Sequence, residues 1–133
     1  MARELRVAIG SAADIVTARQ AGRELASEVG FTTSDLTVIA TAISEIARNI
    51  LEYAKQGEII LQLVRKESRS GLMVVARDEG PGIRDISQAM QDGFTTSKGL
   101  GIGLPGTRRL MDEFDIVSRP GQGTTVMMRK WVR

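Results

Sequence analysis

Three glycine-rich segments in the second half of this 133-residue chain decide which fold it can adopt: D-E-G-P-G-I at Asp78–Ile83, K-G-L-G-I-G-L-P-G at Lys98–Gly106 and G-Q-G-T-T at Gly121–Thr125. Glycine accumulates where the backbone needs a positive φ or where a ligand must touch the backbone itself. Backbone N–H groups that no side chain covers, followed by a helix start, form a concavity that suits phosphate groups. We therefore interpret Asp78–Thr125 as one half of a nucleotide pocket.

The composition is that of one soluble domain spanning residues 1–133, with 42% hydrophobic and 26% charged residues. The chain has no cysteine, which excludes disulfides and thiolate metal sites, and no histidine, which excludes a histidine base or phosphoacceptor. A net charge of +2 and an aromatic content of 4% argue against a nucleic-acid surface. No leader peptide and no apolar run of membrane-spanning length is evident. We expect a cytoplasmic protein with no nucleic-acid and no membrane partner.

The spacing of apolar residues predicts a β-α-α-β-β-α-α-β-β order. The expected strands are Glu4–Ile9, Glu58–Val64, Gly71–Arg77, Phe114–Val117 and Thr124–Val132, and the expected helices are Ala12–Val29, Asp35–Ala54, Asp85–Gln91 and Leu104–Phe114. Thr33 or Ser34 is expected to cap the second helix. The glycine-rich loop Asp92–Gly103 is too long for a simple connector, so we expect it to be mobile. This order predicts an α/β (α+β) two-layer sandwich, with helices on one face of a mixed, mostly antiparallel sheet.

Glu45 and Asn49 are four residues apart on the predicted helix Asp35–Ala54, so both project from one face, one turn apart. An acid and an amide in this arrangement suit a hard divalent cation, because Asn49 offers a carbonyl oxygen to Mg²⁺ and phosphate oxygens can complete the shell. Glu45 can then take a proton from a nearby hydroxyl or water. A solvated helix face also explains such a pair, so its meaning depends on the glycine segments.

Two residues are candidates for recognising a nucleotide base. Asp78 follows the apolar run Leu72–Ala76, and a carboxylate at a strand end can accept a hydrogen bond from an exocyclic amine, the group that distinguishes adenine. A simple Asp-Gly turn is the alternative. Thr125 can bond the base through its hydroxyl or through a water. Taken alone, the segment Gly121–Thr125 is equally explained as a hairpin turn that leads into an edge strand.

The middle segment contains G-x-G-x-x-G at Gly101–Gly106, but no strand immediately precedes it and no acid lies suitably about twenty residues further on, so a dinucleotide fingerprint is excluded. The chain also lacks a G-x-x-x-x-G-K-[ST] phosphate loop and the protein-kinase H-R-D and D-F-G motifs. What remains is a glycine loop that leads into a helix N-terminus at Leu104, where free N–H groups can bind phosphate. Lys98 either adds a positive charge on the terminal phosphate or is an exposed loop lysine.

In this order, E-x-x-x-N, D-x-G-x-G-I, G-L-G-I-G-L and G-x-G-T-T resemble the GHKL (Bergerat-fold) ATP-binding superfamily, which includes gyrase, MutL-type proteins and histidine-kinase catalytic domains. The resemblance covers nearly the whole chain and implies ATP between the helices of the sandwich, under a mobile lid formed by residues 93–103. It implies that Asn49 holds Mg²⁺, that Glu45 is the general base and that Asp78 binds the adenine amine. The other implied nucleotide-binding residues are Gly80, Gly82, Ile83, Lys98, Gly99, Gly101, Gly103, Leu104 and Thr125.

Within this superfamily, the chain is similar to the RsbT-type serine/threonine switch-protein kinases of the stressosome, which are relatives of the anti-sigma-factor kinases. The run Lys98–Phe114 carries this likeness, and the chain has neither a phosphoacceptor histidine nor the second domain of gyrase and MutL types. The resemblance implies transfer of the γ-phosphate of ATP to Ser or Thr on a STAS-domain antagonist or scaffold protein. It also implies binding and activation of a PP2C-type phosphatase.

Two alternatives stay open, because these motifs describe ATP binding and not its use. The protein could be an anti-sigma-factor kinase, or a non-catalytic, nucleotide-gated module that sequesters a sigma factor or drives a phosphatase. An ATPase fragment of a larger machine fits less well, because the chain closes its own sheet. The apolar stripes of the first two helices fit pairing with a second copy or with a partner's helix, so the oligomeric state is open as well.

Overall fold

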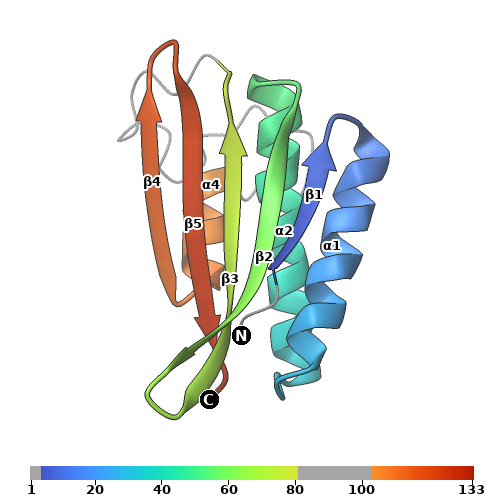
Figure 1. The fold of residues 1–133 in the computed structure, drawn as a ribbon, viewed down its shortest axis with the longest axis vertical. Coiled ribbons are helices and arrows are strands. Elements are labelled where there is room, and N and C mark those ends of the chain that lie inside the picture. The colour runs from blue at the N-terminus through green and yellow to red at the C-terminus, as the bar shows by residue number, and fades with distance from the viewer. Residues whose placement is uncertain (1–3, 81–102) are drawn as a thin grey trace.

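Five strands form one sheet, and the helices lie together on one of its faces (Figure 1). The structure is a computed structural model that describes residues 4–80 and 103–133. In chain order, its elements are β1 (Glu4–Ile9), α1 (Ala12–Ser27), α2 (Thr33–Tyr53), β2 (Gly57–Lys66), β3 (Arg69–Asp78), α4 (Gly103–Leu110), β4 (Glu113–Arg119) and β5 (Gly123–Trp131). The predicted two-layer α/β sandwich is confirmed.

The strands follow the order β1-β2-β3-β5-β4, and each of the four pairings among them is antiparallel. The expectation of a mixed sheet is therefore wrong for the described strands. Two of the pairings, β2 with β3 and β4 with β5, are hairpins, and a short hairpin joins antiparallel strands by construction. The end of β3 and the start of β5 meet at the upper end of the sheet in Figure 1.

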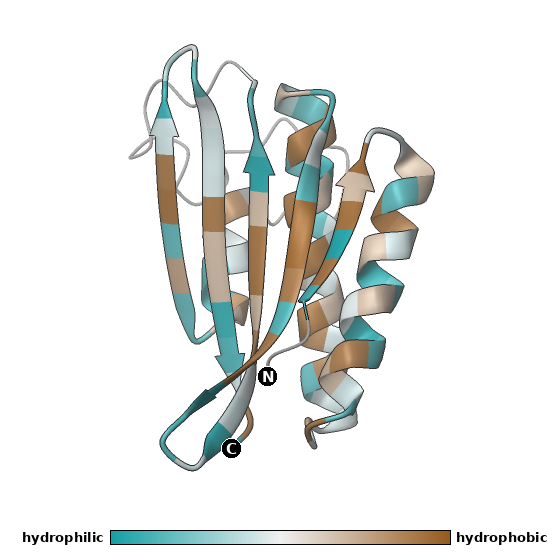
Figure 2. Ribbon diagram, viewed as in Figure 1, coloured by the Kyte–Doolittle hydropathy of each residue, from teal (hydrophilic) through white to brown (hydrophobic). Residues whose placement is uncertain are grey.

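The core fills the space between the sheet and the two long helices. Alternate residues of each strand face the helices, and those at the centre, such as Leu61, Val74 and Met128, have no exposed surface. Ile39, Ile43 and Ile46 of α2 pack against them. Figure 2 shows the matching hydrophobic segments at mid-height on the strands and along the helices. Period-2 patterning on the strands and helical patterning on α2 thus supply the two halves of one core.

The central helix α2 begins at Thr33, two residues earlier than expected. Its cap is Thr32, whose side-chain oxygen accepts a hydrogen bond from the Asp35 backbone N–H at 3.1 Å, so the assignment to Thr33 or Ser34 is wrong. The helix runs for 21 residues and ends close to the tip of β3. In the ranges that the structure describes, no helix is long and apolar enough to cross a membrane.

The helix predicted at Leu104–Phe114 is shorter than expected. It ends at Leu110, and Phe114 belongs to β4. The Asp112 backbone N–H donates to the Arg129 carbonyl at 2.9 Å, so the chain joins the sheet at this point instead of adding another helical turn. The predicted helix Asp85–Gln91 and nearly all of the predicted loop Asp92–Gly103 lie outside the described residues; Gly103 itself begins α4.

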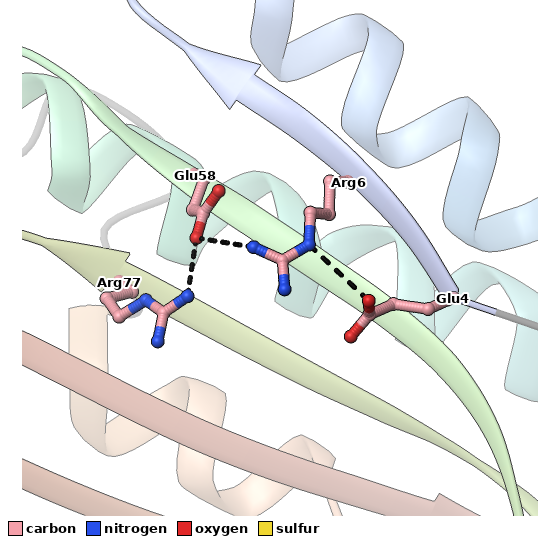
Figure 3. Close-up of polar contacts among 4 residues, drawn as sticks. All are labelled: Glu4, Arg6, Glu58 and Arg77. Carbon is pink, nitrogen blue, oxygen red and sulfur yellow. Dashed lines mark hydrogen bonds and ion pairs between the residues drawn. The ribbon is translucent and has the colours of Figure 1, made fainter.

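The outer face of the sheet, opposite the helices, carries a row of charges (Figure 3). Arg6 lies 3.4 Å from Glu4 and 3.4 Å from Glu58, and Arg77 lies 2.7 Å from Glu58. The hydrogen bond from Arg77 lowers the pKa of the Glu58 carboxyl below its ordinary value. Charged side chains on this face therefore pair with one another.

Candidate nucleotide-binding site

One face of α2 presents three polar side chains at four-residue intervals: Glu45, Asn49 and Tyr53. The Glu45 side chain is 2% exposed. The Asn49 Nδ2 group is buried and has no hydrogen-bond partner among the described residues. Tyr53, at the last turn, is 42% exposed. A buried amide with an unpaired N–H group costs free energy in the unliganded fold, so its place in α2 points to a ligand.

Asp78 is the last residue of β3 and lies half-buried near the last turn of α2. Its Oδ1 atom accepts a hydrogen bond from the Gly80 backbone N–H at 2.9 Å, which turns the chain away from the sheet. Both readings of this residue, a turn former and a base-binding carboxylate, are thus compatible. One oxygen organises the turn, and the described residues offer no hydrogen-bond partner for the other.

Two glycines allow neighbouring segments to approach Asp78 closely. A Cβ atom on Gly123, whose φ is +103°, would lie 2.1 Å from the Asp78 carbonyl oxygen. A Cβ atom on Gly80 would lie 2.5 Å from the Ala54 Cβ atom, at the end of α2. The glycine segments therefore bring α2, β3 and β5 into contact around Asp78, which is a packing role in addition to any contact with a ligand.

A narrow cavity of about 40 Å³ lies between α2, α4 and the sheet. Its walls combine apolar and polar side chains: Ile46, Asn49, Ile50, Tyr53, Ala76, Asp78, Leu104, Thr124 and Val126. Asp78 and Thr124 also line a larger hollow of about 870 Å³ beyond the strand ends. Binding pockets for small molecules typically measure roughly 300–1,000 Å³. The hollow is within this range and the narrow cavity is below it, and the two share Asp78 and Thr124.

The two threonines of β5 lie on opposite faces of the sheet. Thr124 is directly opposite Asp78 and shares its cavity, whereas Thr125 is opposite Arg77 and lines the hollow instead. Sequence reasoning named Thr125 and missed Thr124 and Tyr53. Two signals could have found them: strand alternation relative to Asp78, and the continuation of the four-residue spacing from Asn49 to Tyr53.

The remaining predicted site residues fall into three groups. Leu104, in the first turn of α4, lines the cavity together with Asn49 and Asp78. Glu45 lies one turn before Asn49, and Arg48 Nη1 is 3.5 Å from its Oε1 atom; among the described residues, Glu45 lines neither hollow. Gly82, Ile83, Lys98, Gly99 and Gly101 lie outside the described residues.

A model of the histidine kinase-like ATPase domain family matches residues 10–130. The chain belongs to this family. The chain is similar to a serine/threonine kinase and to anti-sigma factors. The serine/threonine-protein kinase RsbT of Bacillus subtilis (strain 168) is 54% identical over 120 residues, 90% of either chain. Anti-sigma F factors of Thermoanaerobacter sp. (strain X514) and Caldanaerobacter subterraneus subsp. tengcongensis are 33% and 32% identical, and each alignment covers 86% of this chain and 83% of the relative.

These similarities confirm the predicted membership of the GHKL group near the RsbT-type kinases. They support serine/threonine protein kinase activity, and ATP use follows from the family. The histidine kinase-like ATPase fold of this chain thus brings together Asn49, Asp78 and Leu104, with Thr124 beside Asp78. Glu45 is buried close by on α2.

Proposed function

We propose that this protein binds Mg-ATP at the cavity between α2, α4 and the sheet and uses it as a serine/threonine protein kinase. The observation that carries the proposal is the buried Asn49 Nδ2 group, which has no hydrogen-bond partner among the described residues and lies in a cavity that Asp78 and Thr124 line from the ends of β3 and β5. Asp78 would accept a hydrogen bond from the adenine amine, and Thr124 would contact the base beside it. The start of α4 at Gly103 and Leu104 would face the phosphates with free N–H groups.

The residues present fit a magnesium ion. The Asn49 side chain can offer its carbonyl oxygen to the ion and donate its free Nδ2 group to a phosphate oxygen. When bound, Mg²⁺ would neutralise charge on the phosphates of ATP. Gly80, Gly82, Ile83, Lys98, Gly99 and Gly101 complete the proposed nucleotide contacts, and residues 93–103 would form a mobile lid.

Glu45 is the proposed general base. Its carboxylate would take the proton from the hydroxyl of the incoming serine or threonine as the oxygen bonds to the γ-phosphorus and the bond to the leaving ADP breaks. The chain has no histidine, so the phosphoryl group goes directly to the protein substrate. Glu45 and Asn49 lie one turn apart on α2, which supports a base at Glu45 close to the proposed phosphate site.

The proposed substrate is a STAS-domain antagonist or scaffold protein in a cytoplasmic bacterial partner-switching pathway, with a PP2C-type phosphatase as a second partner. The similarity to the serine/threonine-protein kinase RsbT supports this assignment. The similarity to anti-sigma F factors supports the alternative, an anti-sigma-factor kinase or a nucleotide-gated module that sequesters a sigma factor.

Calorimetric titration of Mg-ATP, Mg-ADP and Mg-GTP tests the binding site. We expect adenine-selective binding that requires magnesium and weakens by about tenfold in Asp78→Asn, the change that one charge-assisted hydrogen bond accounts for. Thr124→Val and Thr125→Val form a matched pair, because the two residues are adjacent but face opposite sides of β5. Only the first should weaken binding. Equal affinity for ATP and GTP in the wild type would contradict the adenine assignment.

Phosphotransfer to a purified STAS-domain protein tests the reaction. We expect ATP-dependent phosphorylation on serine or threonine that Glu45→Gln reduces by about 10²–10⁴-fold, the usual contribution of a general base, while Mg-ATP still binds. Binding of a sigma factor without any phosphotransfer would favour the nucleotide-gated module. Full activity in Glu45→Gln would remove Glu45 from the mechanism.

A further inference from the structure

Lys130 is a buried cation that the proposed chemistry does not use. Its side chain lies on the helix-facing side of β5, two residues beyond the fully buried Met128, and it is 7% exposed. Its ammonium group donates to the Leu110 carbonyl oxygen at 3.1 Å. Within the described part of the chain, no carboxylate lies within ion-pairing distance of it. A buried ammonium is costly unless its surroundings compensate for the lost water.

The compensating group is the C-terminal end of α4. Leu110 is the last residue of this helix, so its carbonyl is one of those that no intrahelical N–H can reach. Carbonyls at this end carry the negative part of the helix dipole, which a cation stabilises. Lys130 therefore supplies to α4 both a hydrogen-bond donor and the favourable charge, and it links the helix to the sheet.

Such a link matters because α4 is a weak helix by itself. It has only eight residues, G-L-P-G-T-R-R-L, and two of them are glycines, which are poor helix formers. Isolated helices of this length are not stable in water, so tertiary contacts must hold α4 in shape. Its main contacts with another element are with α2. The Lys130 hydrogen bond adds a second attachment, to β5.

The chain immediately after α4 is also tied to β5. The Asp112 N–H donates to the Arg129 carbonyl at 2.9 Å, and the Trp131 N–H donates to Asp112 Oδ2 at 2.8 Å. With Lys130, three successive residues of β5 thus hold the C-terminal end of α4. At the opposite end of the same short helix, Leu104 forms part of the cavity wall beside Asn49 and Asp78.

From this geometry we infer that Lys130 is a positioning residue for the nucleotide: it fixes α4 at its C-terminal end so that Leu104 and the first turn stay in place at the cavity. The inference rests on the proposed function, because the nucleotide is the ligand that α4 would contact. If α4 loosens without Lys130, the binding-competent fraction falls and the apparent affinity falls with it. The bond joins β5 to α4 and involves no residue of α2, β2 or β3.

Lys130→Met and Lys130→Gln remove the charge, and Lys130→Arg keeps a cationic donor. Arg129→Gln is the matched control, because it changes only the neighbouring outer-face side chain, which pairs with Glu113 at 3.1 Å, and keeps the backbone carbonyl to which Asp112 donates. Two measurements are made on the full chain: Mg-ATP affinity by calorimetry, and backbone hydrogen exchange without nucleotide. We expect about tenfold weaker Mg-ATP binding in the Met and Gln variants, partial recovery in the Arg variant and no change in the control.

Hydrogen exchange separates a positioning role from a general structural one. The inference predicts faster exchange at residues 106–110 in the Met and Gln variants, with unchanged protection in β2 and β3. Unchanged exchange in α4, or loss of protection throughout β2 and β3 in both variants, would overturn it. Failure of the wild type to bind Mg-ATP would count against the proposed function, and the exchange measurement would still decide whether Lys130 holds α4.

Discussion

On the outer face of the sheet, Glu4, Arg6, Glu58 and Arg77 pair with one another in a continuous row, whereas behind the sheet the buried Asn49 Nδ2 group has no partner in the part of the chain that the structure describes. The outer groups are exposed to water and cost little to leave unpaired, yet they are paired. The inner amide is in the environment where an unpaired group costs most. This difference supports the proposal of a ligand site on the helix-facing side of the sheet.

Of the proposed substitutions, one at the close contact between Gly123 and Asp78 should reduce stability most. We expect Gly123→Ala to destabilise the fold by about 3 kcal/mol, because the new Cβ would lie 2.1 Å from the Asp78 carbonyl oxygen at a φ of +103°. Gly121→Ala is the control: its φ is +77°, but no described atom lies within 4 Å of the new Cβ, so about 1 kcal/mol is expected. Denaturant unfolding measures the stability of both variants. Equal losses of stability would mean that the positive φ, and not the contact with Asp78, causes the effect at Gly123.

The Asn49 amide tests the contrast between the two faces directly. Asn49→Leu replaces an unpaired buried amide by an apolar group of similar size, so we expect stability to hold or to rise by about 1 kcal/mol. Mg-ATP affinity should fall by at least about tenfold, because the proposed metal ligand is lost. This combination, measured by thermal unfolding and calorimetry, is the expected signature of a ligand site. A variant that is less stable and binds normally would make Asn49 a structural residue.

Acid titration addresses the outer face. The hydrogen bond from Trp131 Nε1 lowers the pKa of Glu113 below its ordinary 4.5, and the bond from Arg77 does the same for Glu58. Because the folded pKa values are depressed, the stabilisation is fully present above about pH 4.5 and is lost as the pH falls through the folded values. The double variant Glu58→Gln/Glu113→Gln should lose less stability between pH 5 and pH 3, in roughly that window. If stability depends on pH in the same way in the wild type and the double variant, neither carboxyl contributes to the loss of stability in acid.

A double-mutant cycle on one outer pair should give the smallest effect. For Arg77 and Glu58 we expect a coupling energy of about 0.5 kcal/mol or less, because water and salt screen exposed ion pairs. The cycle compares Arg77→Ala, Glu58→Ala and the double variant in urea, at low salt and again in 1 M salt, where coupling should nearly vanish. A coupling of several kcal/mol that survives salt would contradict the picture of a solvated outer face.

Much of the fold could be predicted because it follows from local pattern. Alternation of apolar residues placed Glu4–Ile9 within the sheet, and helical spacing placed the apolar stripe of α2. The errors occurred where a tertiary contact outweighs local propensity. Asp112–Phe114 would continue a helix by itself, but the Asp112 N–H bonds to Arg129 and the chain enters β4. Single-residue shifts, such as the cap at Thr32, reflect competition among adjacent polar residues.

For the candidate site, the four-residue spacing correctly predicted that Asn49 lies one turn from Glu45 on α2. The apolar run before Asp78 correctly predicted that this residue lies at the end of a strand. The choice between Thr124 and Thr125 depends on the register of β5 against β3. A shift of one residue exchanges the two faces, and no local pattern in G-Q-G-T-T fixes that register.

By itself, the sequence determined the two-layer fold, the family and the helix and strand that bear Asn49 and Asp78, because periodicity and ordered glycine motifs are local properties. Tertiary structure alone decided that Thr124 lies beside Asp78, that the Asn49 Nδ2 group has no partner among the described residues and that Lys130 donates to the Leu110 carbonyl at the end of α4. The contacts of Thr124 with Asp78 and of Lys130 with Leu110 each join residues 20 or more positions apart. Their distances depend on how helices and strands pack, which no local pattern encodes.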